Sequence, residues 1–172
     1  MKNLILIWLV FITVKASSLN PVAYASVEKF SGLWYEIART YNFYQRNCVA
    51  SSVEYVLQDD KEYKVFNRCF KEQIGGELIE YKGNAKPFSG DNISILEMTY
   101  FWIFTNEYAI YYIDDDYTSA VVADKDFDHV WIMSRTPFMK KSRLKKIKNI
   151  LASQIDLNNL IYTPQDKKGR YK

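Results

Sequence analysis

Eight short segments in which apolar and polar residues alternate follow one another along the chain, and they constrain the fold more than any other feature. They span residues 33–41, 51–58, 62–70, 77–86, 92–99, 107–113, 117–124 and 129–135. Such alternation indicates strands with one buried face. The connections are of hairpin length and rich in Asp, Asn and Gly, which suit tight turns. The pattern predicts an all-β fold, an eight-stranded up-and-down antiparallel β-barrel, because closure leaves no sheet edge exposed.

Composition agrees with one β domain. The chain has 172 residues, of which 16% are aromatic, including 14 tyrosines. Aromatic side chains are enriched in strands because they pack well on a pleated surface. An eight-stranded barrel has an interior that holds either packed side chains or one small ligand.

The period of the apolar pattern changes after Pro137. Apolar residues then recur at helical spacing, namely Leu144, Ile147, Ile150, Leu151 and Ile155. This spacing predicts a C-terminal amphipathic α-helix packed on the outside of the barrel. Six cations lie beside that stripe, namely Lys140, Lys141, Arg143, Lys145, Lys146 and Lys148. This basic face is either solvated or in contact with anionic lipid head groups. Residues 160–162 read as a short strand at the barrel edge, and residues 166–172 as a loose polar tail.

The N-terminus has the order of a secretory signal peptide. Lys2 precedes an apolar run over residues 4–14, and Ala23-Tyr24-Ala25 is an Ala-x-Ala cleavage pattern. Cleavage nearer Ala16 is an alternative. An uncleaved anchor is another, although a membrane-spanning helix needs about 20 apolar residues.

Cleavage at the Ala-x-Ala pattern makes residues 1–25 the signal peptide and residues 26–165 the barrel domain with its helix. We therefore expect an exported protein, in a periplasm, at an outer-membrane surface or secreted. Removal of the signal peptide takes away Lys2 and Lys15 and leaves a net charge of about +1. A nearly neutral domain lacks the basic footprint that nucleic-acid binding requires.

Two cysteines, Cys48 and Cys69, are expected to form a disulfide in an exported protein. A loop of this size contributes roughly 3 kcal/mol to stability. Free thiols in a reducing compartment are the alternative. Alternation points odd-numbered residues inward on both strands, so Cys48 has the wrong parity to pair directly unless a bulge lies near it.

Motifs at the two ends of the strand pattern resemble those of the lipocalin family. They are Gly32-Leu33-Trp34-Tyr35-Glu36-Ile37 and Trp131-Ile132-Met133-Ser134-Arg135-Thr136-Pro137. Three segments between them add to the likeness, namely Lys64-Val65-Phe66-Asn67-Arg68-Cys69, Lys82-Gly83-Asn84-Ala85 and Tyr112-Ile113-Asp114-Asp115-Asp116-Tyr117. The chain is most similar to bacterial envelope and apolipoprotein D-like lipocalins, but Asp115-Asp116-Tyr117 replaces the usual Thr-Asp-Tyr. The resemblance implies a container for a small hydrophobic ligand such as a fatty acid or a lysophospholipid.

Several residues of these motifs have structural roles in this interpretation. Trp34 closes one end of the barrel, and Arg135 lies across its indole face. A cation–π contact of this kind is worth about 0.5–2 kcal/mol. Gly32 permits the turn into the first strand.

Alternation from an inward Trp34 selects the residues that should face the interior. The expected ligand-binding residues are Glu36, Ala38, Tyr55, Val65, Asn67, Tyr81, Tyr108, Tyr112 and Trp131. Such a lining, apolar and aromatic with a few polar groups, is typical of small-molecule pockets. For each residue, ordinary core packing is the alternative to ligand contact.

Two aromatic segments lie outside this set. Residues 41–46 are either a lid over the open end or a packed Ω-loop. The run Tyr100-Phe101-Trp102-Ile103-Phe104 could line the mouth, meet a membrane or another copy of the chain, or pack on itself.

Catalytic and metal-binding signals are weak. The single histidine, His129, makes neither a metal cluster nor a convincing base for a nucleophile. The aspartate run at residues 114–116 lacks the spacing of a calcium loop. Glu36 with Glu54 or Glu97 is the one conceivable acid–base pair. We therefore expect no metal and no cofactor.

The leading hypothesis is a non-enzymatic carrier or store for a lipid-like ligand, present as a monomer or weak homodimer. Two alternatives remain at this point. One is a lipocalin-type enzyme acting on a bound lipid. The other is a membrane-surface protein that works through its basic helix.

Overall fold

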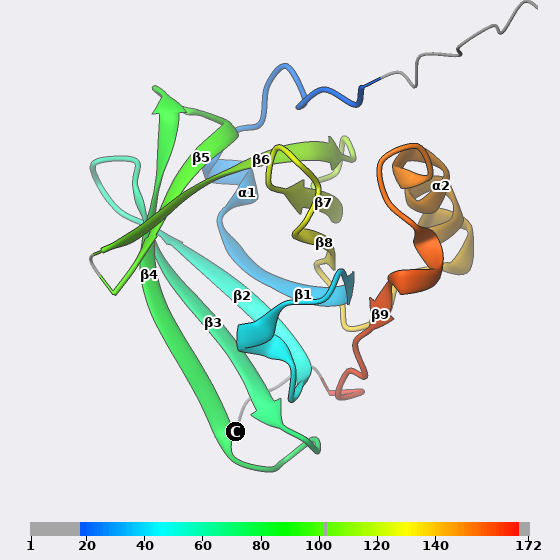
Figure 1. The fold of residues 1–172 in the computed structure, drawn as a ribbon. Coiled ribbons are helices and arrows are strands. Elements are labelled where there is room, and N and C mark those ends of the chain that lie inside the picture. The colour runs from blue at the N-terminus through cyan, green and yellow to red at the C-terminus, as the bar shows by residue number, and fades with distance from the viewer. Residues whose placement is uncertain (1–17, 102, 169–172) are drawn as a thin grey trace, which may run out of the picture.

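The protein is a closed antiparallel β-barrel (Figure 1). The computed structural model describes residues 18–101 and 103–168. The strands are β1 (Gly32–Arg39), β2 (Cys48–Leu57), β3 (Tyr63–Lys71), β4 (Leu78–Ser89), β5 (Asn92–Tyr100), β6 (Phe104–Ile113), β7 (Ser119–Ala123), β8 (Val130–Ser134) and β9 (Ile161–Tyr162). They follow the order β2-β3-β4-β5-β6-β7-β8-β1-β9, and a further pairing of β1 with β2 closes the first eight. The predicted eight-stranded up-and-down barrel is confirmed.

One long helix covers the outside of the barrel. The helical elements are α1 (Val27–Phe30), η1 (Phe43–Gln45), α2 (Lys141–Leu151) and η2 (Leu157–Asn159). Figure 1 shows α2 beside the barrel wall, and its Ile147 and Leu151 are fully buried in a cluster with Val121 and Ile132. β9 pairs with β1. The predicted outer helix and short edge strand are therefore confirmed. No helix in the described part of the chain is long and apolar enough to cross a membrane.

The barrel wall separates two apolar layers. The inner layer contains Phe30, Trp34, Tyr63 and Val65, all nearly or fully buried. The outer layer lies between the wall and α2. Strand side chains alternate between the two faces, so strands covered on both sides have few exposed positions. All five residues of β7 are buried for this reason.

Register shifts interrupt the alternation of inward and outward side chains along two strands, and they contradict two predictions. One lies between Glu36 and Ala38 of β1, and another between Ile110 and Tyr112 of β6. Each inserts an extra residue, so the residues beyond it change face. Ala38 and Tyr112 therefore lie in the helix-facing layer. The inward orientation expected for both was wrong.

A third register shift allows the disulfide. It lies between Val49 and Ser52 of β2, and Ala50 within it has a φ of +50°. Beyond the shift, Cys48 lies opposite Lys71 and its Sγ bonds to that of Cys69. The predicted disulfide is confirmed, and so is the bulge that its parity required.

The closed end of the barrel is built on Arg135. Its guanidinium carbon lies 3.8 Å from the centroid of the Trp34 ring. The guanidinium donates to four backbone carbonyls, those of Lys29 (2.8 Å), Leu33 (2.9 Å), Phe30 (3.0 Å) and Tyr117 (3.2 Å). Lys29 and Phe30 end α1, where helical carbonyls lack partners of their own. Arg135 thus joins α1, β1 and the β6–β7 turn, and the predicted contact with Trp34 is confirmed.

Further observations concern Arg135, its neighbour Gly32 and its stacking partner Trp34. Gly32 has a φ of +94°, a conformation that favours glycine, and a Cβ there would lie 3.4 Å from Arg135 Nη1. Burial lowers the pKa of Arg135 to about 10, so the side chain is still a cation at neutral pH. Trp34 is fully buried, and its Nε1 donates to Phe30 O at 2.8 Å.

The segment before α1 packs against the barrel. Val22 N donates to Ile110 O at 2.8 Å, and Ala25 N donates to the side chain of Asn92 at 3.0 Å. Ala25 is fully buried in the inner layer. The apolar run of the proposed signal peptide lies outside the described residues. Cleavage after Ala25 stays a prediction, and it would detach this bonded segment from the barrel.

We expect Trp34→Ala to lower the free energy of unfolding by about 3–5 kcal/mol, because it removes the largest fully buried side chain. Urea denaturation followed by circular dichroism measures the change. Phe88→Ala, at a side chain that is 72% exposed, is the matched control and should change stability little. Equal losses in both variants would contradict the role given to Trp34.

Candidate functional site

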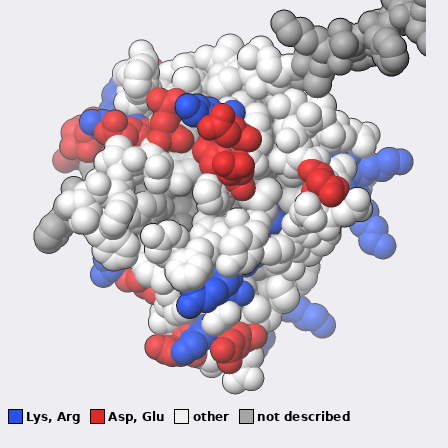
Figure 2. Space-filling model, viewed as in Figure 1, with Lys and Arg blue, Asp and Glu red and all other residues white. Residues whose placement is uncertain are grey.

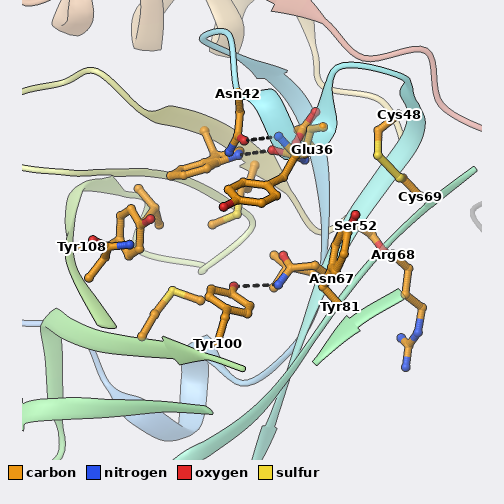
Figure 3. Close-up of a pocket in the computed structure, with 18 of the residues that line it drawn as sticks. Glu36, Asn42, Cys48, Ser52, Asn67, Arg68, Cys69, Tyr81, Tyr100 and Tyr108 are labelled. Atoms are coloured by element: carbon orange, nitrogen blue, oxygen red, sulfur yellow. Dashed lines mark hydrogen bonds between the residues drawn. A yellow bond between two sulfur atoms is a disulfide. The ribbon is translucent and has the colours of Figure 1, made fainter. Parts of the chain in front are cut away.

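A cavity of about 230 Å³ occupies the barrel interior toward the end where the β5–β6 turn lies. Six of the nine predicted ligand-binding residues line it, namely Glu36, Tyr55, Asn67, Tyr81, Tyr108 and Trp131. Figure 3 shows side chains from several strands and from the loop after β1 converging on this space. Alternation therefore placed most of the predicted residues on the cavity wall. Ligand contact by these residues stays a prediction.

The other three predicted residues lie elsewhere. Val65 faces inward as expected, but it is fully buried in the packed inner layer rather than on the cavity wall. Ala38 and Tyr112 lie on the helix side of the wall, where the register shifts place them.

Part of the lining was missed from the sequence. It includes Ser52, Met98, Asn106 and Val122. Met98 and Tyr100 share a parity on β5, so alternation on that strand was a usable signal for them. Ser52 directly follows the register shift of β2, and the alternation pattern selected its neighbour Val53 instead.

The loop between β1 and β2 is fastened to the cavity wall by Gln45. Gln45 Nε2 donates to Glu36 Oε2 at 2.7 Å, and its Oε1 accepts from Trp131 Nε1 at 2.9 Å. Its backbone carbonyl accepts from Arg39 Nη2 at 2.6 Å. Within this loop Tyr44 lines the cavity although it is 65% exposed, and Phe43, which is 61% exposed, does not line it. The loop therefore has features of both predicted alternatives. It is anchored, as expected of a packed Ω-loop, and it borders the mouth, as expected of a lid.

The β5–β6 turn forms another part of the rim. Phe101 and Phe104 line the cavity although more than half of each side chain is exposed, and Ile103 is 75% exposed. Trp102 lies outside the described residues. The aromatic run thus lines the mouth, which was one of its predicted roles.

The cavity wall has two charged residues, and both are neutralised. Glu36 is buried and accepts hydrogen bonds from Arg39, Gln45 and Thr163. Arg68 is paired with Glu54 and Glu80 at 2.7 Å each. Figure 3 shows its side chain extending away from the cavity. The interior therefore offers no free cation among the residues that line it.

Tyrosine hydroxyls and side-chain amides supply much of the remaining polarity of the cavity wall. Asn67 Nδ2 donates to the Tyr100 hydroxyl oxygen at 2.7 Å (Figure 3). Burial raises the pKa of Tyr55, Tyr100 and Tyr108 above the usual value near 10. These groups are therefore uncharged at neutral pH and can donate a hydrogen bond to a ligand.

The residues considered for catalysis have separate partners. Glu36 is held by Arg39, Glu54 by Arg68 and Glu97 by Lys86. His129 Nδ1 lies 2.8 Å from Asp124 Oδ2. Residues 18–101 and 103–168 contain no group of three or more His, Cys, Asp or Glu arranged for a metal ion.

The closed floor, the apolar cavity and the aromatic rim define a β-barrel of the ligand-container type. The sequence pattern of the Lipocalin-like domain matches residues 25–165, most of the chain. The chain therefore belongs to the lipocalin family.

Relatives and solved structures agree. The chain is 29% identical over 150 residues to the outer membrane lipoprotein Blc of Vibrio cholerae, covering 86% of this chain and 87% of that protein. It is 28% identical over 149 residues to apolipoprotein D of Mus musculus, covering 81% and 76%. Insecticyanin from the tobacco hornworm Manduca sexta has the same fold, with a TM-score of 0.70 at 18% identity and coverage of 89% and 87%.

The buried tyrosines predict a loss of stability at high pH. The pKa of Tyr55, Tyr63 and Tyr100 is raised by burial, so the unfolded chain releases these protons first. The stability linked to this shift is complete below about pH 10 and lost as the pH rises above it. Tyrosinate absorbance should show a fraction that ionises only when circular dichroism reports unfolding. Titration of all 14 tyrosines near pH 10 with the fold intact would contradict this.

Proposed function

We propose that this lipocalin binds one small hydrophobic ligand, such as a fatty acid or a lysophospholipid, and transports or stores it. The observation that carries the proposal is the cavity itself, which stays open beside the packed residues Trp34 and Val65. An acyl chain in contact with Tyr55, Met98 and Trp131 would leave water, and each buried methylene contributes about 0.8 kcal/mol.

Non-enzymatic binding is favoured over catalysis on a bound lipid. Of the three carboxylates considered for an acid–base pair, Glu36 alone lines the cavity, and its oxygens accept three hydrogen bonds. General acid–base catalysis needs a group within hydrogen-bond reach of the reacting atom and free to exchange a proton.

Contact with a membrane surface is a secondary proposal. Figure 2 shows Lys and Arg side chains projecting on the side where α2 lies. Part of this basic face is engaged internally, since Arg143 pairs with Asp114 and Lys146 lies 5.3 Å from the Tyr112 ring centroid. The exposed Lys140, Lys141 and Lys145 are the groups available for anionic head groups.

We also propose that the protein is exported, as the N-terminal pattern and the disulfide suggest. The names of the Vibrio cholerae and mouse relatives place them at an outer membrane and among apolipoproteins, and both fit export. The packed segment around Val22 and Ala25 favours cleavage near Ala16 over cleavage after Ala25.

Filling the cavity should abolish binding. Val122→Trp places a large ring in the lined space and should weaken binding of oleate or lysophosphatidylcholine at least about tenfold, at a stability cost of about 1–3 kcal/mol. Equilibrium dialysis with radiolabelled lipid measures the affinity, and mass spectrometry should recover the lipid chemically unchanged.

The matched control is Val56→Trp, which makes the same change at a 38% exposed position on β2. It should bind like the unmodified protein. Equal affinity in both variants would place the ligand outside the cavity, and release of a modified lipid would favour the enzyme.

The processing site predicts the mass of the mature protein. If cleavage occurs near Ala16, the intact mass after expression with export will include residues 18–25. A mature chain beginning at Ser26, with unchanged thermal stability, would show that the segment packed on Asn92 and Ile110 is dispensable and would contradict this assignment.

A further inference from the structure

A second pocket opens beside the mouth of the cavity. Its lining includes Arg46 and Asn47 from the β1–β2 loop and Lys71, Glu77 and Ile79 from the β3–β4 hairpin. It shares Tyr44, Cys48 and Tyr81 with the cavity. A ligand leaving the cavity past these shared residues therefore enters the side pocket.

The two walls of the side pocket are joined by backbone hydrogen bonds. Glu72 N donates to Asn47 O at 2.7 Å, which ties the loop to the hairpin. Lys71 N donates to Glu77 O at 2.9 Å within the hairpin. The Cys48–Cys69 disulfide fixes the strands below them. The pocket is thus a built part of the rim.

The side pocket has the available positive charge that the cavity lacks. The Arg46 guanidinium lies 4.1 Å from the centroid of the Phe43 ring, and no carboxylate within the described ranges pairs with it. Lys71 lies 3.6 Å from Glu77, and this exposed pair is easily exchanged for a stronger partner. Figure 2 shows charges of both signs at the end where this hairpin turns.

An anionic head group cannot find such a partner inside the barrel. Burial of an unpaired carboxylate or phosphate is costly, and the cations next to the cavity, Arg39 and Arg68, already hold carboxylates. Guanidinium groups, in contrast, bind phosphate oxygens through charge-assisted hydrogen bonds. The two pockets therefore match the two ends of a single-chain amphiphile.

We propose that the side pocket is an anion subsite in which Arg46 and Lys71 bind the phosphate head of a single-chain lipid whose tail fills the cavity. This rests on the proposed function, because the tail must bind first. The head group stays at the rim, next to solvent, and the tail enters the barrel toward Tyr55. The same chemistry would suit a free phosphate ester, and a soluble head-group compound distinguishes the two sources.

The test compares two ligands with the same acyl chain, lysophosphatidate and monoacylglycerol, by isothermal titration calorimetry. Arg46→Gln combined with Lys71→Gln should weaken lysophosphatidate binding about tenfold or more and leave monoacylglycerol binding within about twofold. Added salt should weaken only the lysophosphatidate complex of the unmodified protein. Equal effects on both lipids, or none on either, would overturn the subsite.

Two controls separate the possible causes. Lys64→Gln removes one positive charge from an exposed position of β3 near its other end and should leave both affinities unchanged. Glycerol 3-phosphate, which has the head without the tail, should not compete, and competition that depends on Arg46 would instead make the pocket a free-anion site. Failure of monoacylglycerol to bind the unmodified protein would refute the container function itself, and the subsite with it.

Discussion

The contact of Arg135 with Trp34 is the interaction on which the rest of the structure depends. The guanidinium of Arg135 covers the indole face of Trp34. Its N–H groups donate to four backbone carbonyls, so they are engaged within the protein and do not pair with an anion. Those carbonyls belong to α1, to the start of β1 and to the turn before β7. The two ends of the strand sequence are therefore joined at one point, where the barrel must close.

This closed floor determines where an open space can exist. Phe30 packs on Trp34 with ring centroids 4.9 Å apart, and Tyr55 packs on Phe30 at 5.1 Å. Between Tyr55 and the closed end the interior is filled by side chains. On the other side of Tyr55 the side chains surround the cavity. The outer layer under α2 supports the same wall from the other side. The floor and the outer layer thus each contribute a buried apolar cluster that supports the wall around the space.

Polar groups are distributed along the same axis. The floor holds a cation that backbone oxygens satisfy, the middle offers tyrosine hydroxyls, and Glu36 with Gln45 fastens the loop near the mouth. Arg46 and Lys71, the cations of the proposed subsite, lie at the rim. From the tyrosine hydroxyls to the mouth, polarity therefore rises toward solvent, which matches the order of groups in the amphiphile that we propose to bind with its tail inside.

Much of this architecture could be predicted from the sequence, and the failures have identifiable physical causes. Strand alternation has a period of two, so an inward Trp34 predicted Glu36, Tyr55 and Trp131 as cavity residues. One extra residue reverses that parity, which is why Ala38 and Tyr112 were placed on the wrong face. The bulge near Cys48 was predictable because a disulfide demanded it. The anchoring of Gln45 depends on partners far along the chain, and no local pattern indicates it.

The most direct test of the account uses a lysophospholipid with a nitroxide spin label at the end of its acyl chain. Paramagnetic broadening of backbone amide signals reports which residues lie near the label in the complex. If the tail enters the barrel first, the strongest broadening will occur in β2 and β3 around Tyr55 and Asn67, with little effect on α2. Broadening confined to α2 or to the outer surface near Phe88 would show that the barrel interior does not hold the ligand.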